Sequence, residues 1–351
     1  MRRVTSAAMF GAALLLAGCS SSASGSAGSA GSSSSSGSGG SAASAPVTVR
    51  LGFLTNITHA SALVGLKEGF FTKDLGSAGT LKPTAFSTGT QETTALLAGQ
   101  LDVAYVGPNP AINAWQKSSG SAVKIISGAA TGGASVVVKK GIMSAAQLKG
   151  KTLATPSLGN TQDVAVRYWL KQNGVTTTAT GGGDAFIKPT TPNSAAVLEF
   201  KSGQIAGGSE PAPYDIEIVQ DGGTVLLSEP GVTTLLVVTQ SFLSAHAAVV
   251  ADLLKAQVQA NDFIRSDPAA AQAGANAELA SYTSKPLKAS IVAAAFKEIT
   301  FTDDPDASSL STDASQAVSL GLLKPVSLSG IFDLDPLNAV LSAAGESPVS
   351  S

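Results

Sequence analysis

The chain has 351 residues, of which 13% are charged and 5% aromatic, with 22 basic against 24 acidic side chains. No basic cluster could neutralise a row of phosphates, so we expect no nucleic-acid partner. One cysteine and two histidines, His59 and His246, exclude internal disulfides and metal clusters as organising devices, and we expect no metal and no cofactor.

The first 18 residues have the pattern of an export signal. Arg2 and Arg3 precede an apolar run that is too short to cross a bilayer, and small residues precede Cys19. The tetrapeptide Leu16–Cys19 (LAGC) resembles a bacterial lipobox, which implies that residues 1–18 are removed and that Cys19 becomes an acylated N-terminus. A plain secretory peptide is the alternative, and the paired arginines leave Sec and twin-arginine export open.

Residues 19–45 predict a tether. Ser20 to Ala45 contains only Ser, Ala and Gly, which cannot bury enough apolar area to fold. Its end-to-end distance is on the order of 25–30 Å. Without Arg2 and Arg3 the chain keeps 20 basic and 24 acidic residues, a net charge of −4. We therefore expect an acidic domain held near a membrane.

About 306 residues follow the tether, a size that predicts two lobes rather than one core. Strands are expected at 47–54, 81–86 and 101–106, and helices near 66–71, 91–98 and 111–117. Each strand ends in a loop that opens a helix: Thr55–His59, Ser87–Thr90 and Gly107–Pro110. In an open α/β sheet such loops share the carboxyl edge, where ligands bind.

The next part of the sequence predicts a second lobe. The glycine-rich segment Gly128–Gly133 separates two β-rich runs and is interpreted as a crossover between lobes. Further strands are expected at 124–127, 134–139, 185–188, 205–208, 225–227 and 234–239, with a polar loop at 209–214. Helices are expected at 144–148, 193–202, 247–266, 269–282, 288–298, 307–320 and 336–344, the chain beyond Ser241 being helical throughout. Two crossings between lobes imply a hinge and a cleft.

Residues 153–174 predict a strand, a turn and a helix that presents its N-terminus to a ligand. Asn160 is the expected N-cap. The free N–H groups of such a helix start, with the hydroxyls of Thr155, Ser157 and Thr161, can hold an anionic or strongly polar group. An ordinary connection between strand and helix is the alternative.

Four segments in this order resemble the aliphatic sulfonate, nitrate and taurine class of ABC-transporter substrate-binding proteins: Gly99–Ile112, Ser157–Gly174, Phe200–Tyr214 and Phe332–Leu341. The resemblance implies an α/β, two-lobed periplasmic-binding-protein fold of type II, whose lobes close over a small molecule. In these terms lobe 1 comprises residues 46–133 and 234–351, and lobe 2 comprises residues 134–233.

Mapping the family's ligand loops onto this chain implies a set of contact residues. They are Thr55, Asn56, His59, Ser87, Thr88, Gly89, Gly107, Asn109, Gly133, Ser157, Gly159, Asn160, Thr161, Gln162 and Glu210. The alternatives are helix capping by Ser87 and Thr88, a structural turn at Asn109 and a solvated His59. Glu210 is expected either to pair with a ligand ammonium or to form a salt bridge that latches the lobes. Trp115 and Trp169, at helical spacing among apolar residues, are expected in the core.

None of these loops contains Lys or Arg, so an anion there would rely on N–H groups and hydroxyls. This suits a weakly basic sulfonate better than a phosphate. We expect an alkanesulfonate or taurine; nitrate, bicarbonate and a thiamine-pyrimidine precursor are the alternatives.

The resemblance implies a binding protein that is monomeric and has no enzymatic activity. Its partners would be an ABC permease and its ATPase, and Cys19 would anchor it on the extracytoplasmic face of the membrane. That face is a periplasm or the outside of a Gram-positive cell, which the long tether favours. An enzyme of the same fold is a competing class, although no Ser-His-Asp order supports it. A surface adhesin is another, and the few aromatic residues argue against it.

Overall fold

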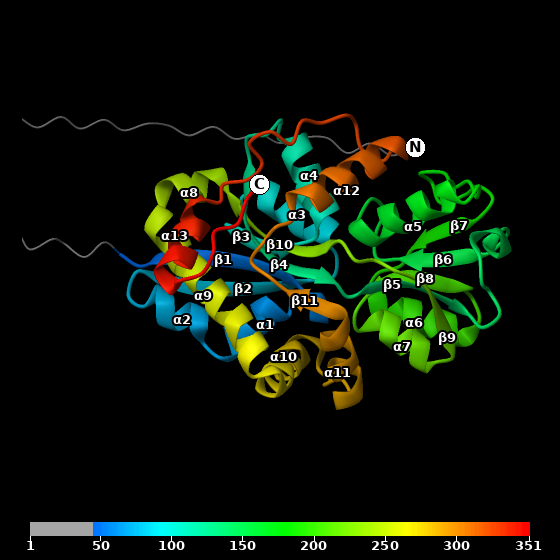
Figure 1. The fold of residues 1–351 in the computed structure, drawn as a ribbon, viewed down its shortest axis with the longest axis horizontal. Coiled ribbons are helices and arrows are strands. Elements are labelled where there is room, and N and C mark those ends of the chain that lie inside the picture. Colours follow the sequence, from blue (N-terminus) through cyan, green and yellow to red (C-terminus); the bar gives the residue numbers. More distant parts are fainter. Residues whose placement is uncertain (1–44) are drawn as a thin grey trace, which may run out of the picture. The chain divides into compact units, whose positions relative to one another are not determined.

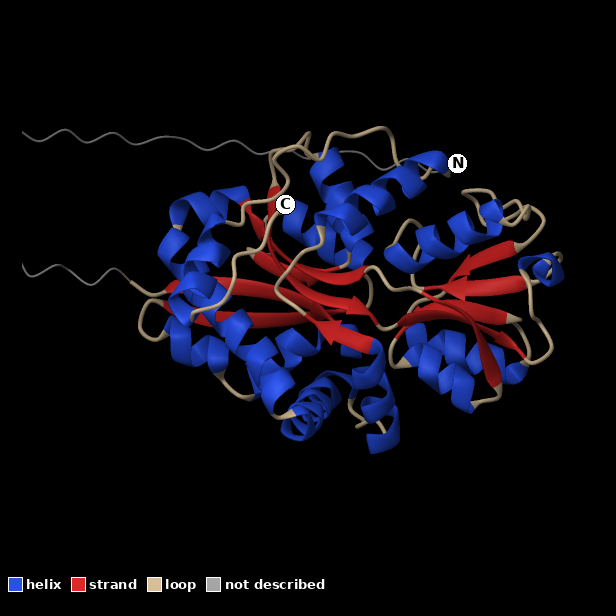
Figure 2. Cartoon of the chain, viewed as in Figure 1, coloured by secondary structure: helices blue, strands red, loops and turns tan. Residues whose placement is uncertain are grey.

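The computed structural model describes residues 45–351. The expected signal peptide (1–18), Cys19 and the tether up to Ser44 lie outside the described residues. Residues 45–351 form one compact unit that contains two β-sheets, each covered by helices on both faces (Figures 1 and 2). The expected α/β fold with two lobes is confirmed. None of the helices within this range is both long and apolar enough to cross a membrane.

Lobe 1 is built on a six-stranded sheet whose three N-terminal strands are parallel to one another. The strand order is β11 (Ile299–Phe301), β4 (Val123–Gly132), β10 (Val232–Thr239), β3 (Val103–Val106), β1 (Val47–Leu54) and β2 (Gly79–Phe86). β1 is parallel to β2 and β3, whereas β10 is antiparallel to β3 and β4. The carboxyl ends of β1, β2 and β3 therefore meet at one edge of the sheet, as the sequence predicted.

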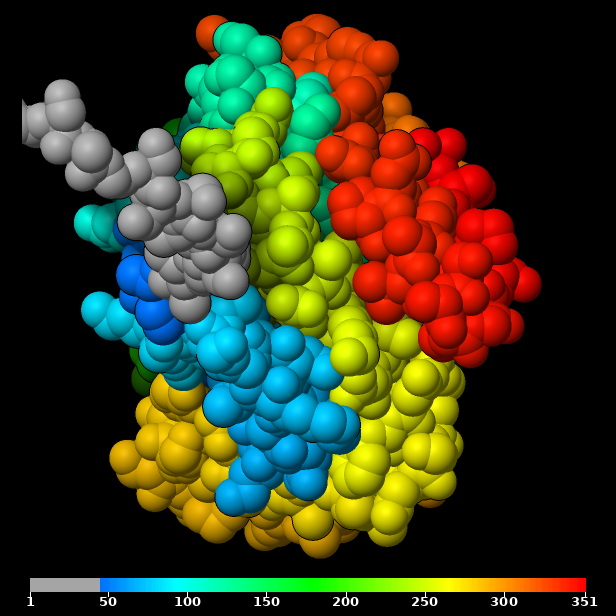
Figure 3. Space-filling model, turned by 90° about the vertical axis from the view of Figure 1, so that its left-hand side faces the viewer, coloured from blue at the N-terminus to red at the C-terminus, as the bar shows by residue number. Residues whose placement is uncertain are grey.

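Helices from both ends of the sequence cover this sheet. They are η1 (Ile57–His59), α1 (Ala60–Lys67), α2 (Phe70–Leu75), α3 (Gly89–Leu97), α4 (Pro108–Lys117), α8 (Gln240–Ala245), α9 (Ala247–Ser266), α10 (Pro268–Thr283), α11 (Ala289–Glu298), α12 (Ala307–Ser319) and α13 (Asp335–Ala344). On the end of lobe 1 shown in Figure 3, α2, α9 and the C-terminal segment lie side by side. The largest apolar core lies between the sheet and α1, α2, α9 and α10.

Lobe 2 is built on a five-stranded sheet with the order β7 (Phe186–Pro189), β6 (Thr152–Thr155), β8 (Gly207–Pro211), β5 (Ala134–Lys139) and β9 (Gly223–Ser228). β6 is parallel to β7 and β8. Its helices are η2 (Ala145–Leu148), α5 (Thr161–Gln172), α6 (Asn193–Ser202) and α7 (Tyr214–Gln220). One core packs under α5 and a smaller one packs under α6 and α7.

The first crossing is shorter than the expected segment Gly128–Gly133 but ends at the same residue, whereas the second lies a few residues earlier than expected. β4 continues through the glycine-rich segment to Gly132. Glycine is required at position 128 within this strand, because a Cβ there would lie 2.2 Å from the carbonyl oxygen of Asp304. The first crossing is confined to Gly132 and Gly133, whose φ angles of +70° and +72° favour glycine. The second crossing comprises residues 229–231, since β10 already pairs with β4 at Val232. The expected boundary at 233–234 therefore falls inside β10.

Four other expectations are corrected. Ser209 and Glu210 belong to β8 and not to a loop. The chain beyond Ser241 is not helical throughout, because residues 299–301 add the edge strand β11. The short elements α2, α7 and α8 were missed. Trp115 is buried as expected and its indole N–H donates to Ser327 O at 2.8 Å, whereas Trp169 is partly exposed.

Candidate functional site: a polar cleft between the lobes

A cavity of about 30 Å³ lies between the two lobes. Its walls come from the segments that follow β1, β2 and β3 in lobe 1 and β6 and β7 in lobe 2, and from Leu54, Pro211 and Thr233 within β1, β8 and β10. The lining residues are Leu54, Asn56, Thr58, His59, Ser87, Thr88, Gly89, Gly107, Pro110, Pro156, Asn160, Thr161, Gln162, Asn193, Pro211 and Thr233. A cavity of this size holds about two water molecules. The lobes are thus closed around a space for only a few heavy atoms.

Four helices begin at this cavity. α3 starts at Gly89, α4 at Pro108, α5 at Thr161 and α6 at Asn193, so each presents its N-terminal turn to the cleft. Helix N-termini carry partial positive charge and unsatisfied N–H groups, of which α4 offers fewer because Pro108 and Pro110 have no N–H. The lining includes no Lys, Arg, Asp or Glu among residues 45–351. The cleft therefore favours a negative charge through backbone dipoles instead of a cationic side chain.

The N-terminus of α5 is held in place by a buried network around Asp163. The Asn160 side chain caps the helix by accepting the Asp163 N–H at 3.0 Å, as predicted. The Asp163 carboxylate in turn accepts from Gly159 N at 2.9 Å, from the Thr155 hydroxyl at 3.0 Å and from Arg167 Nε at 2.9 Å. Arg167 and Asp163 are both buried, so their pairing fixes the loop that precedes the helix. The main-chain N–H groups at the start of α5 are consequently held towards the cleft.

Lobe 1 contributes an equivalent helix start and a neutral histidine. Thr88 caps α3 by accepting the Gln91 N–H at 3.3 Å and also lines the cavity, so the capping alternative holds for Thr88. His59 is buried and its Nδ1 accepts the Leu54 N–H at 3.2 Å, so the alternative that His59 is exposed to solvent is wrong. Burial lowers the pKa of His59 to about 3, so the ring is neutral and carries its proton on Nε2.

Several contacts join the lobes across the cleft. The hydroxyls of Thr90 and Ser157 lie 3.2 Å apart, and the Tyr214 hydroxyl donates to Thr55 O at 2.9 Å. Gly107 packs so closely on Thr161 that an added Cβ would lie 2.7 Å from its Oγ1. All of these contacts depend on the closed arrangement.

The cleft brings together nine of the expected ligand residues: Asn56, His59, Ser87, Thr88, Gly89, Gly107, Asn160, Thr161 and Gln162. Six others lie outside its lining: Thr55, Asn109, Gly133, Ser157, Gly159 and Glu210. Asn109 instead donates to the main-chain oxygen of Asp313 at 3.4 Å, and Gly133 forms part of the first crossing. The fifteen ligand contacts themselves stay predictions.

Glu210 forms no salt bridge with any described residue, so the structure does not support the latch, which was one of its two expected roles. Its side chain is fully buried, and neither carboxylate oxygen has a hydrogen-bond partner among the described residues. Burial, with the neighbouring charges of Asp215, Glu229 and Glu199, raises the pKa of Glu210 well above its usual value. Gly208 lies on the same face of β8 as Glu210 and packs on Ala154, which belongs to the core under α6 and α7. Glu210 is thus a buried acid inside lobe 2 whose surroundings favour its protonated form.

Sequence reasoning missed Asn193 and Thr233 in the lining, whereas Thr58 lies in the predicted loop Thr55–His59. Asn193 is the first residue of α6, and its buried Oδ1 has no hydrogen-bond partner within residues 45–351. Its position after β7 matches that of Thr161 after β6. The same strand-loop-helix pattern that identified Thr161 would have identified Asn193.

The comparisons with known proteins agree with this architecture. The sequence model of the NMT1-like family matches residues 42–280, more than half of the chain. The chain belongs to the NMT1-like family. No curated protein sequence matches this NMT1-like protein.

Solved structures with the same fold include three binding proteins, described here by the names they carry. The alkanesulfonate-binding protein SsuA from Xanthomonas axonopodis pv. citri, bound to MOPS, is 17% identical with a TM-score of 0.67, covering 81% of this chain and 96% of that chain. The periplasmic nitrate-binding protein NrtA from Synechocystis PCC 6803 is 14% identical with a TM-score of 0.73. The match covers 85% of this chain and 89% of that chain. A zinc-bound ligand-binding component of an ABC-type import system from Staphylococcus aureus is 14% identical with a TM-score of 0.68. The match covers 84% of this chain and 99% of that chain. The NMT1-like protein therefore has the periplasmic-binding-protein fold.

Proposed function

We propose that this NMT1-like protein is the extracytoplasmic solute-binding component of an ABC importer, and that it captures a small monovalent oxyanion by closure of its two lobes. The convergence of four helix N-termini on a cleft without a charged lining residue is the observation that carries this proposal. Because each lobe contributes about half of the lining, a ligand binds the closed form more tightly and shifts the hinge equilibrium towards it.

The sulfonate group of taurine or a short alkanesulfonate is our first candidate. Its three weakly basic oxygens match N–H and hydroxyl donors such as those of Ser87, Thr161 and Asn193. The structural similarity to an alkanesulfonate-binding protein supports this choice.

Nitrate or bicarbonate is the second candidate, and the size of the cavity favours it. A cavity of about 30 Å³ is closer in size to a compact anion such as nitrate than to an alkanesulfonate, whose alkyl tail requires the lobes to close less completely. A thiamine-pyrimidine precursor is less well supported, because no Phe, Tyr or Trp lines the cleft in the described part of the chain. Within residues 45–351, the only titratable side chain that lines this cleft is the neutral His59, and no nucleophile is paired with a base there. Binding without chemistry is the function that this geometry supports.

A thermal-shift panel on the full chain tests the proposal. Methanesulfonate, taurine, butanesulfonate, nitrate, bicarbonate and sulfate are compared with dimethyl sulfone, a neutral analogue of methanesulfonate. A ligand at about 100 times its Kd stabilises the folded state by about 2.7 kcal/mol. We expect stabilisation by one or more monovalent oxyanions and none by dimethyl sulfone.

The transport role needs a separate measurement. Uptake of the isotope-labelled ligand is compared between cells with and without the gene. Loss of high-affinity uptake supports an importer component, and unchanged uptake contradicts it.

A further inference from the structure

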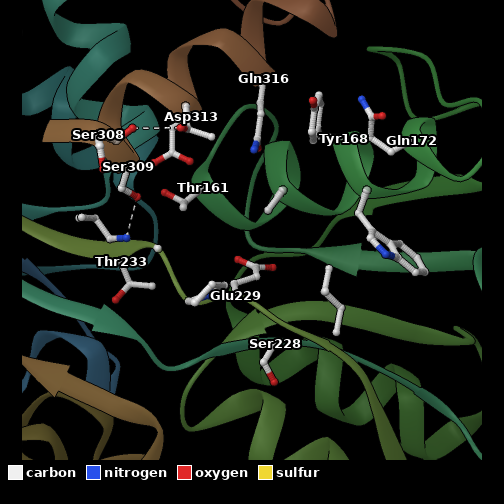
Figure 4. Close-up of a pocket in the computed structure, with 17 residues that line it drawn as sticks. Thr161, Tyr168, Gln172, Ser228, Glu229, Thr233, Ser308, Ser309, Asp313 and Gln316 are labelled. Atoms are coloured by element: carbon white, nitrogen blue, oxygen red, sulfur yellow. Dashed lines mark hydrogen bonds between the residues drawn. The ribbon is translucent and has the colours of Figure 1, made fainter. Parts of the chain in front are cut away.

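A second and larger cavity lies beside the second crossing between the lobes. Its volume is about 410 Å³, within the range of small-molecule sites. We call it the hinge cavity. Its lining comes from α5, the segment from Leu227 to Thr233, and α12: Thr161, Ala165, Tyr168, Trp169, Gln172, Leu227, Ser228, Glu229, Pro230, Gly231, Val232, Thr233, Ser308, Ser309, Thr312, Asp313 and Gln316. Figure 4 shows Asp313 and Gln316 on α12 and Tyr168 and Gln172 on α5, with Glu229 below these helices in this view.

The charged side chains that line the hinge cavity are both acidic. Asp313 Oδ2 is buried and has no hydrogen-bond partner in residues 45–351. Glu229 accepts one hydrogen bond, from the Ser209 hydroxyl at 2.7 Å. The lining contains neither Lys nor Arg within the described range. A buried carboxylate oxygen without a donor is costly, and a ligand that brings a positive charge would satisfy it.

Two aromatic side chains also line the hinge cavity. Tyr168 and Trp169 are both partly exposed on α5, so their rings are available to a ligand. Aromatic faces near carboxylates are the groups that recognise organic cations. A metal ion is a poorer occupant, since no group of three or more His, Cys, Asp or Glu side chains in residues 45–351 is arranged to hold one.

We propose that the hinge cavity binds a small organic ammonium ion, with its positive group at Asp313 and Glu229 and its hydrocarbon part against Tyr168 and Trp169. This site is separate from the oxyanion cleft, with which it shares Thr161 and Thr233 as a common wall. Because α5 belongs to lobe 2 and α12 to lobe 1, the ligand would contact both lobes.

The pH dependence of binding follows from the state of the two acids. Burial raises the pKa of Asp313 to about 7 and that of Glu229 to about 8. Asp306 adds to the effect at Asp313, and Asp313 and Asp215 add to it at Glu229. A cation binds the ionised forms, so its affinity rises with pH between about 6 and 9. A quaternary ammonium has no proton to lose and reports these acids alone.

Calorimetric titration of the full chain with choline tests the proposal, with 3,3-dimethylbutan-1-ol as the neutral analogue of the same shape. We expect choline to bind at least tenfold more tightly than the alcohol, and more tightly at pH 9 than at pH 6. The double variant Asp313→Asn, Glu229→Gln should lose this preference, while Glu346→Gln, which removes an acid outside the cavity, should keep it.

Two results would overturn the proposal. One is equal binding of choline and the alcohol, including no binding of either. The other is an unchanged affinity for choline in the double variant. If the double variant does not fold, as judged by its thermal transition, the single variant Asp313→Asn serves as the test. This substitution breaks no hydrogen bond of Asp313 Oδ2, because that oxygen accepts none in the described residues.

Discussion

Replacement of Gly107 by Ala tests whether ligand binding requires the lobes to close as they do in this structure. Gly107 lies in lobe 1 just before α4, with φ −68° and ψ 159°, which alanine adopts without strain. A Cβ there would lie 2.7 Å from Thr161 Oγ1 in lobe 2, whereas the next nearest atom, Thr233 O, would lie at 3.6 Å. The substitution therefore opposes the closed state and leaves the packing within each lobe unchanged.

The size of the effect follows from this contact. A separation of 2.7 Å is well inside the 3.5–4.0 Å of an ordinary contact. Overpacking of this kind costs about 1–3 kcal/mol, and rotation of the Thr161 side chain brings the cost towards the lower end. A penalty of about 1.4 kcal/mol on the closed state weakens ligand affinity about tenfold, because the ligand must supply that free energy on binding.

Calorimetry with the best oxyanion from the thermal-shift panel measures this loss. Gly182→Ala is the matched control, because its Cβ would make only an ordinary contact of 3.5 Å with Thr178. In a Thr161→Ala background the clash is absent, so Gly107→Ala should then cost much less. Unchanged affinity in Gly107→Ala, or an equal loss in both backgrounds, would refute the closure mechanism.

Three further predictions concern stability. Asn160→Ala should lower the free energy of unfolding by about 0.5–2 kcal/mol in denaturant titrations, because it removes the cap of α5, while Asn173→Ala at the other end should cost less. His59 has a lowered pKa, so its contribution to stability is complete above pH 6.5 and is lost as the pH falls towards 3; His59→Gln should make unfolding less sensitive to acid over that range. Glu229 has a raised pKa, so stability from its protonated form is present below about pH 4.5 and is lost as the pH rises towards 8. Glu229→Gln should flatten that decline, and an unchanged pH profile would contradict the raised pKa of this acid.

The sequence predicted those parts of the fold that local chemistry determines. Asn160 caps α5 as expected, since an Asn before a run of helix formers has one favourable geometry. β4 was cut short because the segment from Gly128 to Gly133 has the composition of a turn. In the structure, Gly128 is required by the close approach of Asp304, a residue 176 positions away in the sequence. Such contacts have no local signal.

The site was predictable at the level of loops but not of side chains. The positions of Thr88 and Thr161 follow from the strand-loop-helix pattern. The direction of the Glu210 side chain depends on the register of β8 within its sheet, which the sequence does not specify. The hinge cavity requires α12 to pack beside α5, and these helices are about 140 residues apart in the sequence, so no motif could indicate it.

The most direct test of the central claim is a calorimetric titration of the wild-type chain and Asn193→Ala with methanesulfonate, nitrate and dimethyl sulfone. Asn193 lines the cleft and its side-chain amide N–H groups can donate to an oxyanion, so its loss removes a ligand contact. The account predicts a Kd below about 1 mM for at least one oxyanion, no binding of the sulfone and about tenfold weaker binding in Asn193→Ala. Wild-type affinity in Asn193→Ala, or binding of neither oxyanion, would contradict it.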